Sequence, residues 1–289
     1  MQSTIAKKVS VKGVGLHTGL VTTLTIYPAP ADSGITFWRS DLAENEKCIL
    51  DPDRIHETQL CTGILLKKEL LMTIEHLLSS MYCEKIDNAL IEVYGPELPI
   101  FDGSAAAYQV LWQEAGRQIQ DKPRRIIEIL KPIKVEEGLN GEYKSAQFIP
   151  AEYFKVHFEV DNFHHPYISG LPNKFTFDFK KDNYWQEIAR ARTFGFLRDV
   201  VFMQERGLAL GGALANALVF DHEKYLNDEG MRFPDEIVRH KVLDAIGDIY
   251  TLGVQIKGEY QGYRSGHLIN NRLIRELENN SDCWRWYEE

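Results

Sequence analysis

The segment from Val238 to Asp248 constrains the fold of this 289-residue chain more than any other part of it. An α-helix advances about 100° per residue, so His240, Asp244 and Asp248 fall within an arc of roughly 80° on one face. The apolar residues lie about opposite and comprise Val238, Val242, Ala245, Ile246 and Ile249. The pattern predicts a helix within residues 235–252 that rests on a core and presents polar groups on its other face.

The polar face of this predicted helix has two interpretations. A histidine and a carboxylate one turn apart on a rigid element can be two ligands of one metal ion. The simpler interpretation is a solvated face with an i,i+4 pair, which stabilises a helix by only a few tenths of a kcal/mol. The HxxxD pattern is too short to decide between them by itself.

Length and composition indicate an ordinary globular protein. Hydrophobic residues make up 44% of the chain and charged residues 26%, which is typical of a soluble fold. A length of 289 residues suits two domains better than one core. The net charge of −9 argues against nucleic acid as the main partner, because phosphate binding requires a basic surface.

The sequence indicates neither export nor membrane insertion. The N-terminus lacks the apolar run of a secretory signal, and no stretch approaches the ~18 uninterrupted apolar residues of a membrane span. The four cysteines include no CxxC pair, which favours reduced thiols. We therefore expect a cytoplasmic protein without an integral membrane segment, acting as a monomer.

Strand and helix patterns occur in both halves of the chain without regular alternation. Strand patterns lie at 20–27, 61–72 (two short strands), 89–94, 126–135, 145–149, 154–160, 175–179 and 254–263, and helical patterns at 74–82, 105–116, 183–191, 199–206 and 235–252. Thr73 and Ser104 are expected to cap the first two helices. The polar stretch 116–124 is the best linker candidate, separating domains at 1–120 and 125–289. This organisation favours the α+β class.

The Glu75-His76 pair is the second feature that suggests chemistry. Adjacent helical residues point about 100° apart, so a metal-bound His76 would leave Glu75 near the metal without ligating it. A general base for a metal-bound water needs that position. The alternative is a surface dipeptide, but the flanking apolar residues, Ile74, Leu77 and Leu78, place the pair at a core edge.

Three further segments carry candidate functional groups. His267 follows a glycine after a predicted strand, although a single histidine is more often structural than catalytic. Thr193 and Arg192 place a hydroxyl and a guanidinium close to an aromatic pair. The glycine-rich turn 13–19 surrounds His17, but it lacks the spacing of a phosphate-binding loop.

Taken together, these segments resemble the UDP-3-O-acyl-N-acetylglucosamine deacetylase family, the zinc amidases of the committed step of lipid A synthesis. The similarity extends from about Thr4 to about Leu277. It rests on six motifs in order: GVGLHTG, TIEHLLSS, ELPIFDGSA, ARTFGF, RHKVLDAIGD and SGHLIN. The resemblance implies two similar α+β domains packed face to face, with the active site between them.

The resemblance also implies a zinc site. The family's ligands correspond to His76, His240 and Asp244 here, and a water would fill the fourth position. Three protein ligands plus water is the pattern of a catalytic rather than a structural zinc. Iron could substitute at such a site, since selectivity follows metal availability as much as affinity.

Five further residues would carry the reaction according to the resemblance. Glu75 would be the general base, and His267 would steady developing charge and protonate the leaving amine. Asp248 would hold His267 and raise its pKa. Thr193 would donate to the oxyanion, and Lys241 would lie toward the sugar or its diphosphate.

The substrate implied by the resemblance is a UDP-linked glucosamine that bears a long 3-O-acyl chain. The apolar insertion between Phe196 and Phe220 would house that chain, although core packing is the simpler explanation. The expected substrate-binding residues are Leu197, Val200 and Gly212 for the acyl chain, Phe194 beside them, and Lys144 and Phe163 for uridine. The family's DFNHP segment is one residue longer here, at 161–166, so uridine contacts near it are left open.

Two alternative functions remain at this point. One is a zinc deacetylase of the same fold that acts on another acetamido sugar or acyl length. The other is a catalytically silent protein that binds a sugar nucleotide or a lipid. Every matched catalytic position carries a competent residue, which argues against the silent protein.

Overall fold

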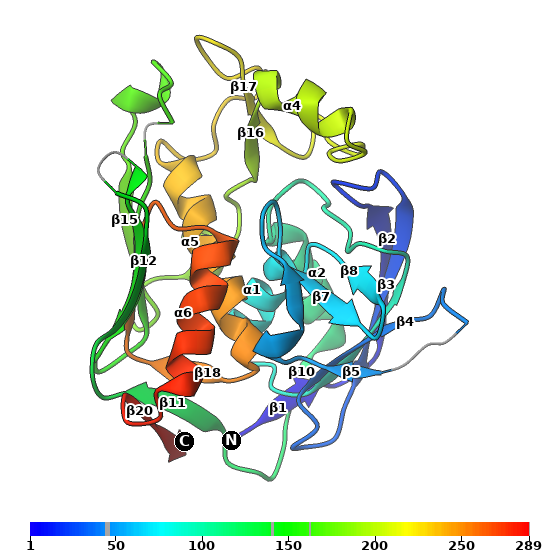
Figure 1. Cartoon of the computed structure of the whole chain (residues 1–289). Coiled ribbons are helices and arrows are strands. Elements are labelled where there is room, and N and C mark those ends of the chain that lie inside the picture. The colour runs from blue at the N-terminus through cyan, green and yellow to red at the C-terminus, as the bar shows by residue number, and fades with distance from the viewer. Residues whose placement is uncertain (44–46, 140–141, 162, 289) are drawn as a thin grey trace.

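The computed structural model describes residues 1–43, 47–139, 142–161 and 163–288. Within these ranges, two five-stranded sheets of the same topology frame the protein (Figure 1). The first has the order β2-β3-β9-β4-β5 and comprises β2 (Val9–Val14), β3 (Val21–Pro28), β4 (Ile35–Arg39), β5 (Cys48–Ile49) and β9 (Ala89–Tyr94). The second has the order β12-β13-β19-β14-β15 and comprises β12 (Ile133–Glu137), β13 (Lys144–Ile149), β14 (Lys155–Glu159), β15 (Lys174–Asp178) and β19 (Glu259–Tyr263).

The two sheets share their strand directions as well as their order. In each sheet one central pair is parallel, β4 with β9 and β14 with β19, and the other pairs are antiparallel. Strands β3 and β14 alternate buried with more exposed side chains, as expected for strands with one face on a core. The prediction of an α+β fold built from two similar units is confirmed.

Helices lie between the two sheets (Figure 1). They are α1 (Glu75–Glu84), α2 (Ala106–Ala115), α5 (Glu236–Ile249) and α6 (His267–Asn279). Helix α5 packs on β14 and β15, and α6 packs on β12 and β13. Helices α1 and α5 pack closely on each other, and a Cβ added to Gly247 would lie 2.0 Å from the carbonyl oxygen of Glu75. The absence of a side chain at Gly247 therefore sets how near the two helices come.

In each half, an insertion follows the fourth strand of the sheet in chain order and leads into the central helix, after which the fifth strand completes the sheet. The first insertion is a three-stranded sheet of β6 (Ile55–Glu57), β7 (Gly63–Leu66) and β8 (Glu69–Leu71), before α1. The second contains β16 (Phe194–Phe196), α4 (Leu197–Gln204) and β17 (Leu218–Phe220), before α5. Short helices complete the chain: η1 (Pro52–Arg54), η3 (Ile168–Gly170), α3 (Tyr184–Glu187) and η4 (Tyr250–Leu252).

Two small sheets contain strands from both ends of the chain and from the connection between the halves. Strand β1 (Ser3–Ile5) pairs with β10 (Arg117–Ile119), and β11 (Arg125–Ile129) pairs with both β18 (Gln255–Lys257) and β20 (Trp284–Glu288). Part of the predicted linker 116–124 is thus a strand. The boundary between domains at 120–125 stays a prediction.

Several local predictions were wrong for identifiable reasons. Thr73 does not cap α1: it has a left-handed φ of 60°, and its hydroxyl donates to Glu97 Oε1 at 2.8 Å. Ser104 lies one residue before the cap of α2, where its Oγ accepts from the Ala106 N–H at 3.2 Å. The predicted helix 183–191 is only the four-residue α3.

Two predicted long strands each divide into two strands of different sheets. The pattern at 126–135 breaks into β11 and β12 around Pro132, which has no N–H to donate to a ladder. The pattern at 254–263 breaks into β18 and β19 at Gly258, where a Cβ would lie 2.7 Å from Ile129 Cγ1. Within the described ranges, none of the helices combines the length and the apolar character needed to cross a membrane.

Candidate active site

Three residues expected as metal ligands converge where α1 meets α5. His76 comes from α1, and His240 and Asp244 come from successive turns of α5. Asp244 Oδ1 lies 3.3 Å from His240 Nε2 and 3.7 Å from His76 Nε2. All three side chains are buried, and one ligand atom from each lies within 4.8 Å of the others. The helix contact thus assembles two imidazoles and a carboxylate in one place.

The hydrogen bonding and the protonation of these side chains suit the binding of a metal ion. Asp244 Oδ1 has no hydrogen-bond partner among the described residues, although it is buried. His240 Nδ1 donates to the Ala191 carbonyl at 3.0 Å, which leaves the lone pair of Nε2 facing the cluster. Burial lowers the pKa of His240 to about 3, despite the opposing charge of Asp244. A neutral imidazole is the form that binds metals.

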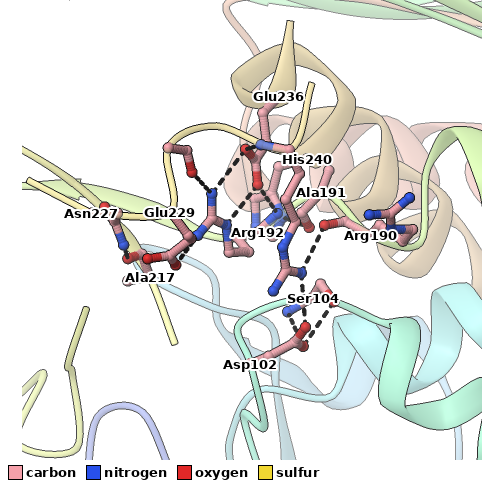
Figure 2. Close-up of polar contacts among 12 residues, drawn as sticks. Asp102, Ser104, Arg190, Ala191, Arg192, Ala217, Asn227, Glu229, Glu236 and His240 are labelled. Atoms are coloured by element: carbon pink, nitrogen blue, oxygen red, sulfur yellow. Dashed lines mark hydrogen bonds and ion pairs between the residues drawn. The ribbon is translucent and has the colours of Figure 1, made fainter. Parts of the chain in front are cut away.

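A buried ion pair fixes the segment just before β16, which faces His240. Figure 2 shows Arg192 between Glu236 and Glu229, beside Ala191 and His240. The Arg192 Nε lies 2.8 Å from Glu236 Oε1, and its Nη1 lies 2.7 Å from Glu229 Oε1. The Arg192 guanidinium therefore has a structural role: its ion pair with Glu236 holds the adjacent Ala191 carbonyl near the start of α5.

Glu75 begins α1 and lies beside the cluster. A carboxylate at this position interacts favourably with the positive end of the helix dipole. The Thr62 N–H donates to Glu75 Oε2 at 3.0 Å. Burial raises the pKa of Glu75, and nearby His267 and His76 oppose that rise. The carboxyl is thus held by one oxygen at the edge of the metal cluster.

His267 begins α6 and is paired with Asp248 of α5. Its Nδ1 lies 2.9 Å from Asp248 Oδ2 and 3.0 Å from Oδ1. Asp248 also accepts from Thr62 Oγ1 at 2.5 Å and from Asn270 Nδ2 at 2.7 Å. Burial alone would lower the pKa of His267, but the charge and hydrogen bonds of Asp248 raise it to about 9. His267 is therefore a cation at neutral pH.

A cavity of about 440 Å³ opens onto these groups. Glu75, His76, His240, Asp244 and His267 line it, together with Thr193, Phe194, Lys144 and Lys241. Lys241 Nζ donates to Asp244 Oδ2 at 2.5 Å, and Asp244 thereby raises the pKa of Lys241 against the effect of burial. The Thr193 N–H donates to the Gly103 carbonyl at 2.7 Å, which places Thr193 beside the loop that precedes α2.

A second cavity of about 280 Å³ adjoins the first, because Lys144, Phe194, Lys241 and Arg264 line both. Phe163 lines only the second, and its ring centroid lies 5.6 Å from that of Phe194. The two residues expected at the uridine end, Lys144 and Phe163, thus lie close to each other. Asn162, in the lengthened 161–166 segment, lies outside the described residues.

The predicted acyl-binding residues lie in the second insertion. Leu197 is 46% exposed and lines a further cavity of about 360 Å³, and Val200 is partly buried on α4. The Gly211 N–H donates to the Leu16 carbonyl at 3.0 Å, so the glycine run touches the backbone of turn 13–19. A Cβ added to Gly212 would lie 3.2 Å from the Ala209 oxygen and 3.8 Å from Leu16 Cδ1. The acyl passage stays a prediction.

Sequence reasoning missed several residues of the site. Thr62 and Asn270 bind Asp248 across 186 and 22 positions, and no local pattern marks such contacts. Arg264, which pairs with Asp161 at 2.7 Å and lines both cavities, was signalled only by its place before the SGH motif. Buried Glu97 accepts from the N–H groups of His17 and Thr18 and so holds the glycine-rich turn.

A metal-ligand cluster beside a buried carboxylate and a histidine–carboxylate pair is typical of hydrolytic metalloenzymes. The sequence model of the family described as UDP-3-O-acyl N-acetylglycosamine deacetylase matches residues 2–279. The chain belongs to this family.

Curated relatives carry the same description over almost their whole length. The UDP-3-O-acyl-N-acetylglucosamine deacetylase of Legionella pneumophila is 46% identical over 285 residues, which is 99% of this chain and 92% of the relative. The enzyme of the same name from Vibrio cholerae serotype O1 is 43% identical over 286 residues, with the same coverage of both chains. That from Vibrio parahaemolyticus is also 43% identical over 286 residues.

Proposed function

We propose that the protein is a zinc-dependent amidohydrolase that removes the N-acetyl group from UDP-3-O-acyl-N-acetylglucosamine. The products are acetate and the free amine, and the reaction is the committed step of lipid A biosynthesis. The observation that supports this most is the buried His76–His240–Asp244 cluster, placed beside Glu75 and the His267–Asp248 pair. Family membership supplies the substrate.

The donor set of the cluster suits zinc. Two imidazole nitrogens and one carboxylate oxygen form a three-ligand set, and an open fourth position is characteristic of catalytic zinc. When bound, zinc acts as a Lewis acid that polarises water and carbonyl oxygen. Iron is the competing metal for the same donors.

The protein's own groups then divide the proton transfers. Glu75 takes a proton from the attacking water as its oxygen bonds to the acetamide carbon. Thr193 donates a hydrogen bond to the carbonyl oxygen as charge develops there. His267, protonated at neutral pH, gives its proton to the amide nitrogen as the carbon–nitrogen bond breaks, which releases the sugar amine and acetate.

The remaining cavity residues suit the rest of the substrate. Lys241, Lys144 and Arg264 bring three cations to the junction of the two cavities, where they would face the diphosphate. Phe163 and Phe194 offer flat apolar faces to the base or the sugar. The acyl chain would lie along the second insertion, with Leu197, Val200 and Gly212.

One experiment tests this function against its alternatives. The purified protein is assayed for metal content and for acetate release from UDP-3-O-acyl-N-acetylglucosamine, from UDP-N-acetylglucosamine and from other acetamido sugars. We expect one zinc per chain and a strong preference for the acylated UDP-sugar. Preference for another sugar would favour a different deacetylase, and tight binding without turnover would favour a silent binding protein.

Two further properties belong to this proposal. The four cysteines are not joined in disulfides, which is compatible with action in the cytoplasm, where thiols stay reduced. We also infer that the protein acts as a monomer. Light scattering on the purified protein tests the second, and a dimer would contradict it.

A further inference from the structure

Among the described residues, Thr62 is the one that hydrogen-bonds to both Glu75, the proposed base, and Asp248, the partner of the proposed acid. It precedes β7 in the first insertion, and its side chain is only 2% exposed. Its N–H donates to Glu75 Oε2 at 3.0 Å, and its Oγ1 donates to Asp248 Oδ1 at 2.5 Å. Its carbonyl accepts from the Ile74 N–H at 3.0 Å, immediately before α1. Its backbone groups are therefore directed at the start of α1, and its hydroxyl is directed at the His267–Asp248 pair.

We infer that Thr62 is a positioning residue that fixes Glu75 and the His267–Asp248 pair relative to each other. This inference rests on the proposed function, because it assigns a role within that reaction. Glu75 comes from the first half of the chain and His267 from the second, and Thr62 bridges them by hydrogen bonds. Its N–H occupies Glu75 Oε2 and leaves Oε1 to take up a proton.

The hydroxyl of Thr62 acts on the acid through Asp248. The Asp248 carboxylate accepts three donors: Thr62 Oγ1, Asn270 Nδ2 and His267 Nδ1. Thr62 Oγ1 also lies 3.2 Å from His267 Nδ1. With donors on both oxygens, the carboxylate cannot rotate, and the imidazole is held with Nε2 toward the cavity. Conserving this orientation matters because a small displacement of an acid from the leaving group slows proton transfer.

The titratable groups around His267 come from three segments of the chain. Asp248 and Asp244 lie on α5, Glu75 on α1 and His17 on the glycine-rich turn. Thr62 is neutral and changes none of these charges when it is replaced. An effect of Thr62 substitution on His267 would therefore report orientation and hydrogen bonding.

The test is Thr62→Val in the zinc-loaded enzyme, with Thr62→Ser as the conservative variant. Valine keeps the shape of the side chain and the backbone N–H but removes the hydroxyl, whereas serine keeps the hydroxyl. We expect Thr62→Val to lower kcat about 10–100-fold, the usual effect of losing a residue that orients a functional group. KM and zinc content should stay unchanged, and Thr62→Ser should recover most of kcat.

Thr251→Val is the matched control. Thr251 is also a buried threonine, and its hydroxyl donates to Asp248 at 2.6 Å, but to the main-chain oxygen rather than the carboxylate. A merely structural role for such hydroxyls predicts similar losses of stability in Thr62→Val and Thr251→Val, with similar kcat. A positioning role predicts a loss of kcat only in Thr62→Val.

A spectroscopic readout separates this inference from the proposed function. The His267 Nδ1 proton, assigned by its loss in His267→Ala, should give a downfield NMR signal that weakens or shifts in Thr62→Val and persists in Thr62→Ser and Thr251→Val. An inactive wild type would remove the proposed function but leave this signal testable. Wild-type kcat in Thr62→Val, zinc loss, or failure of serine to recover kcat would each overturn the inference. Thr62→Ala repeats the test if valine prevents folding.

Discussion

The two halves of the molecule share one topology but contribute differently to the candidate site. Both have a five-stranded sheet with one parallel pair and a central helix that meets its counterpart at the core. From the first half, α1 supplies Glu75 and His76. From the second, α5 supplies His240, Asp244 and Asp248. The scaffold therefore decides where side chains meet, and the residues on the helix faces decide the chemistry.

The last helix of each half, α2 or α6, also differs in the chemical groups that it carries. Helices α2 and α6 follow equivalent strands, β9 and β19. Helix α2 begins at Ala106 without a charged residue in its first turn, whereas α6 begins at His267. A cationic imidazole at a helix N-terminus is unfavourable by itself, so Asp248 must compensate for it. The second half thus carries an acid where the first half carries only packing.

The two insertions also differ. In the first insertion, Ile64 and Leu71 are fully buried. In the second, every residue of α4 is at least partly exposed, including Leu197 at 46%, Val201 at 58% and Phe202 at 55%. Apolar surface of this kind is typical of ligand-binding sites. One insertion adds to the core, and the other leaves apolar side chains exposed, where the acyl chain is proposed to lie.

The largest expected effect comes from removing one proposed metal ligand from each half. His76→Ala and His240→Ala should both lower bound zinc well below one per chain and abolish deacetylation, because two remaining ligands hold zinc poorly. Metal analysis and activity measurement check this. His157→Ala, which removes a histidine of β14 bonded to Thr176, is the control. Full zinc retention in both ligand variants would show that the assignment is wrong.

The second effect concerns the proposed base. Glu75→Gln should keep zinc but lower kcat by roughly 10²–10⁴-fold, the usual contribution of a positioned general base. The amide still accepts from the Thr62 N–H, so the fold should be retained. Steady-state kinetics and metal content measure this. If the metal is released instead, Glu75 is a ligand.

The third prediction is a loss of activity at alkaline pH that depends mainly on His267 and Asp248 of the second half. The pKa of His267 is raised to about 9 by Asp248 in spite of burial. The protonated form is the donor, so kcat/KM should fall about tenfold per pH unit above that pKa. The stabilisation linked to this proton is complete below the unfolded pKa of about 6.5 and is lost as pH rises through about 9.

Asp248→Asn tests whether Asp248 sets the pH at which kcat/KM begins to fall, the alkaline limb of the pH–rate profile. An amide supplies no charge, so the alkaline limb should move to lower pH, and denaturation midpoints should become less sensitive to pH between about 6 and 10. A pH–rate profile for wild type and variant measures it. An alkaline limb that does not move would assign it to another group.

The smallest effect concerns the second insertion. Gly212→Leu should lower kcat/KM several-fold for the acylated UDP-sugar, because each methylene of a bound chain contributes up to ~0.8 kcal/mol. Activity on UDP-N-acetylglucosamine, zinc content and thermal stability should change little. Gly170→Leu, where an added Cβ meets no atom within 4 Å, is the control. Equal losses on both substrates would place the acyl chain elsewhere.

The sequence predicted helices α1 and α5 well because their periodicity is local. The face shared by His240, Asp244 and Asp248 follows from helix geometry alone. Convergence with His76 did not follow from any pattern, since the distance between the two helices depends on tertiary packing at Gly247. The resemblance to a known family supplied that link.

Other features were not predictable because non-local contacts determine them. Thr73 carries a good capping side chain, but buried Glu97 takes its hydroxyl and the backbone turns left-handed. Thr62 bonds to a carboxylate 186 positions away. The sequence contains Pro132 and Gly258, at which the two predicted strands break. It does not indicate that the strands on either side of each break belong to different sheets.

The division of the metal cluster between α1 and α5 has a consequence for biosynthesis. His76 and His240 lie about 160 positions apart. At a translation rate of about 5–20 residues per second, the second set of ligands leaves the ribosome roughly 10–30 s after the first. During that interval Glu75 and His76 have no α5 against which to pack. Assembly of the His76–His240–Asp244 cluster is therefore among the last events in the maturation of this protein.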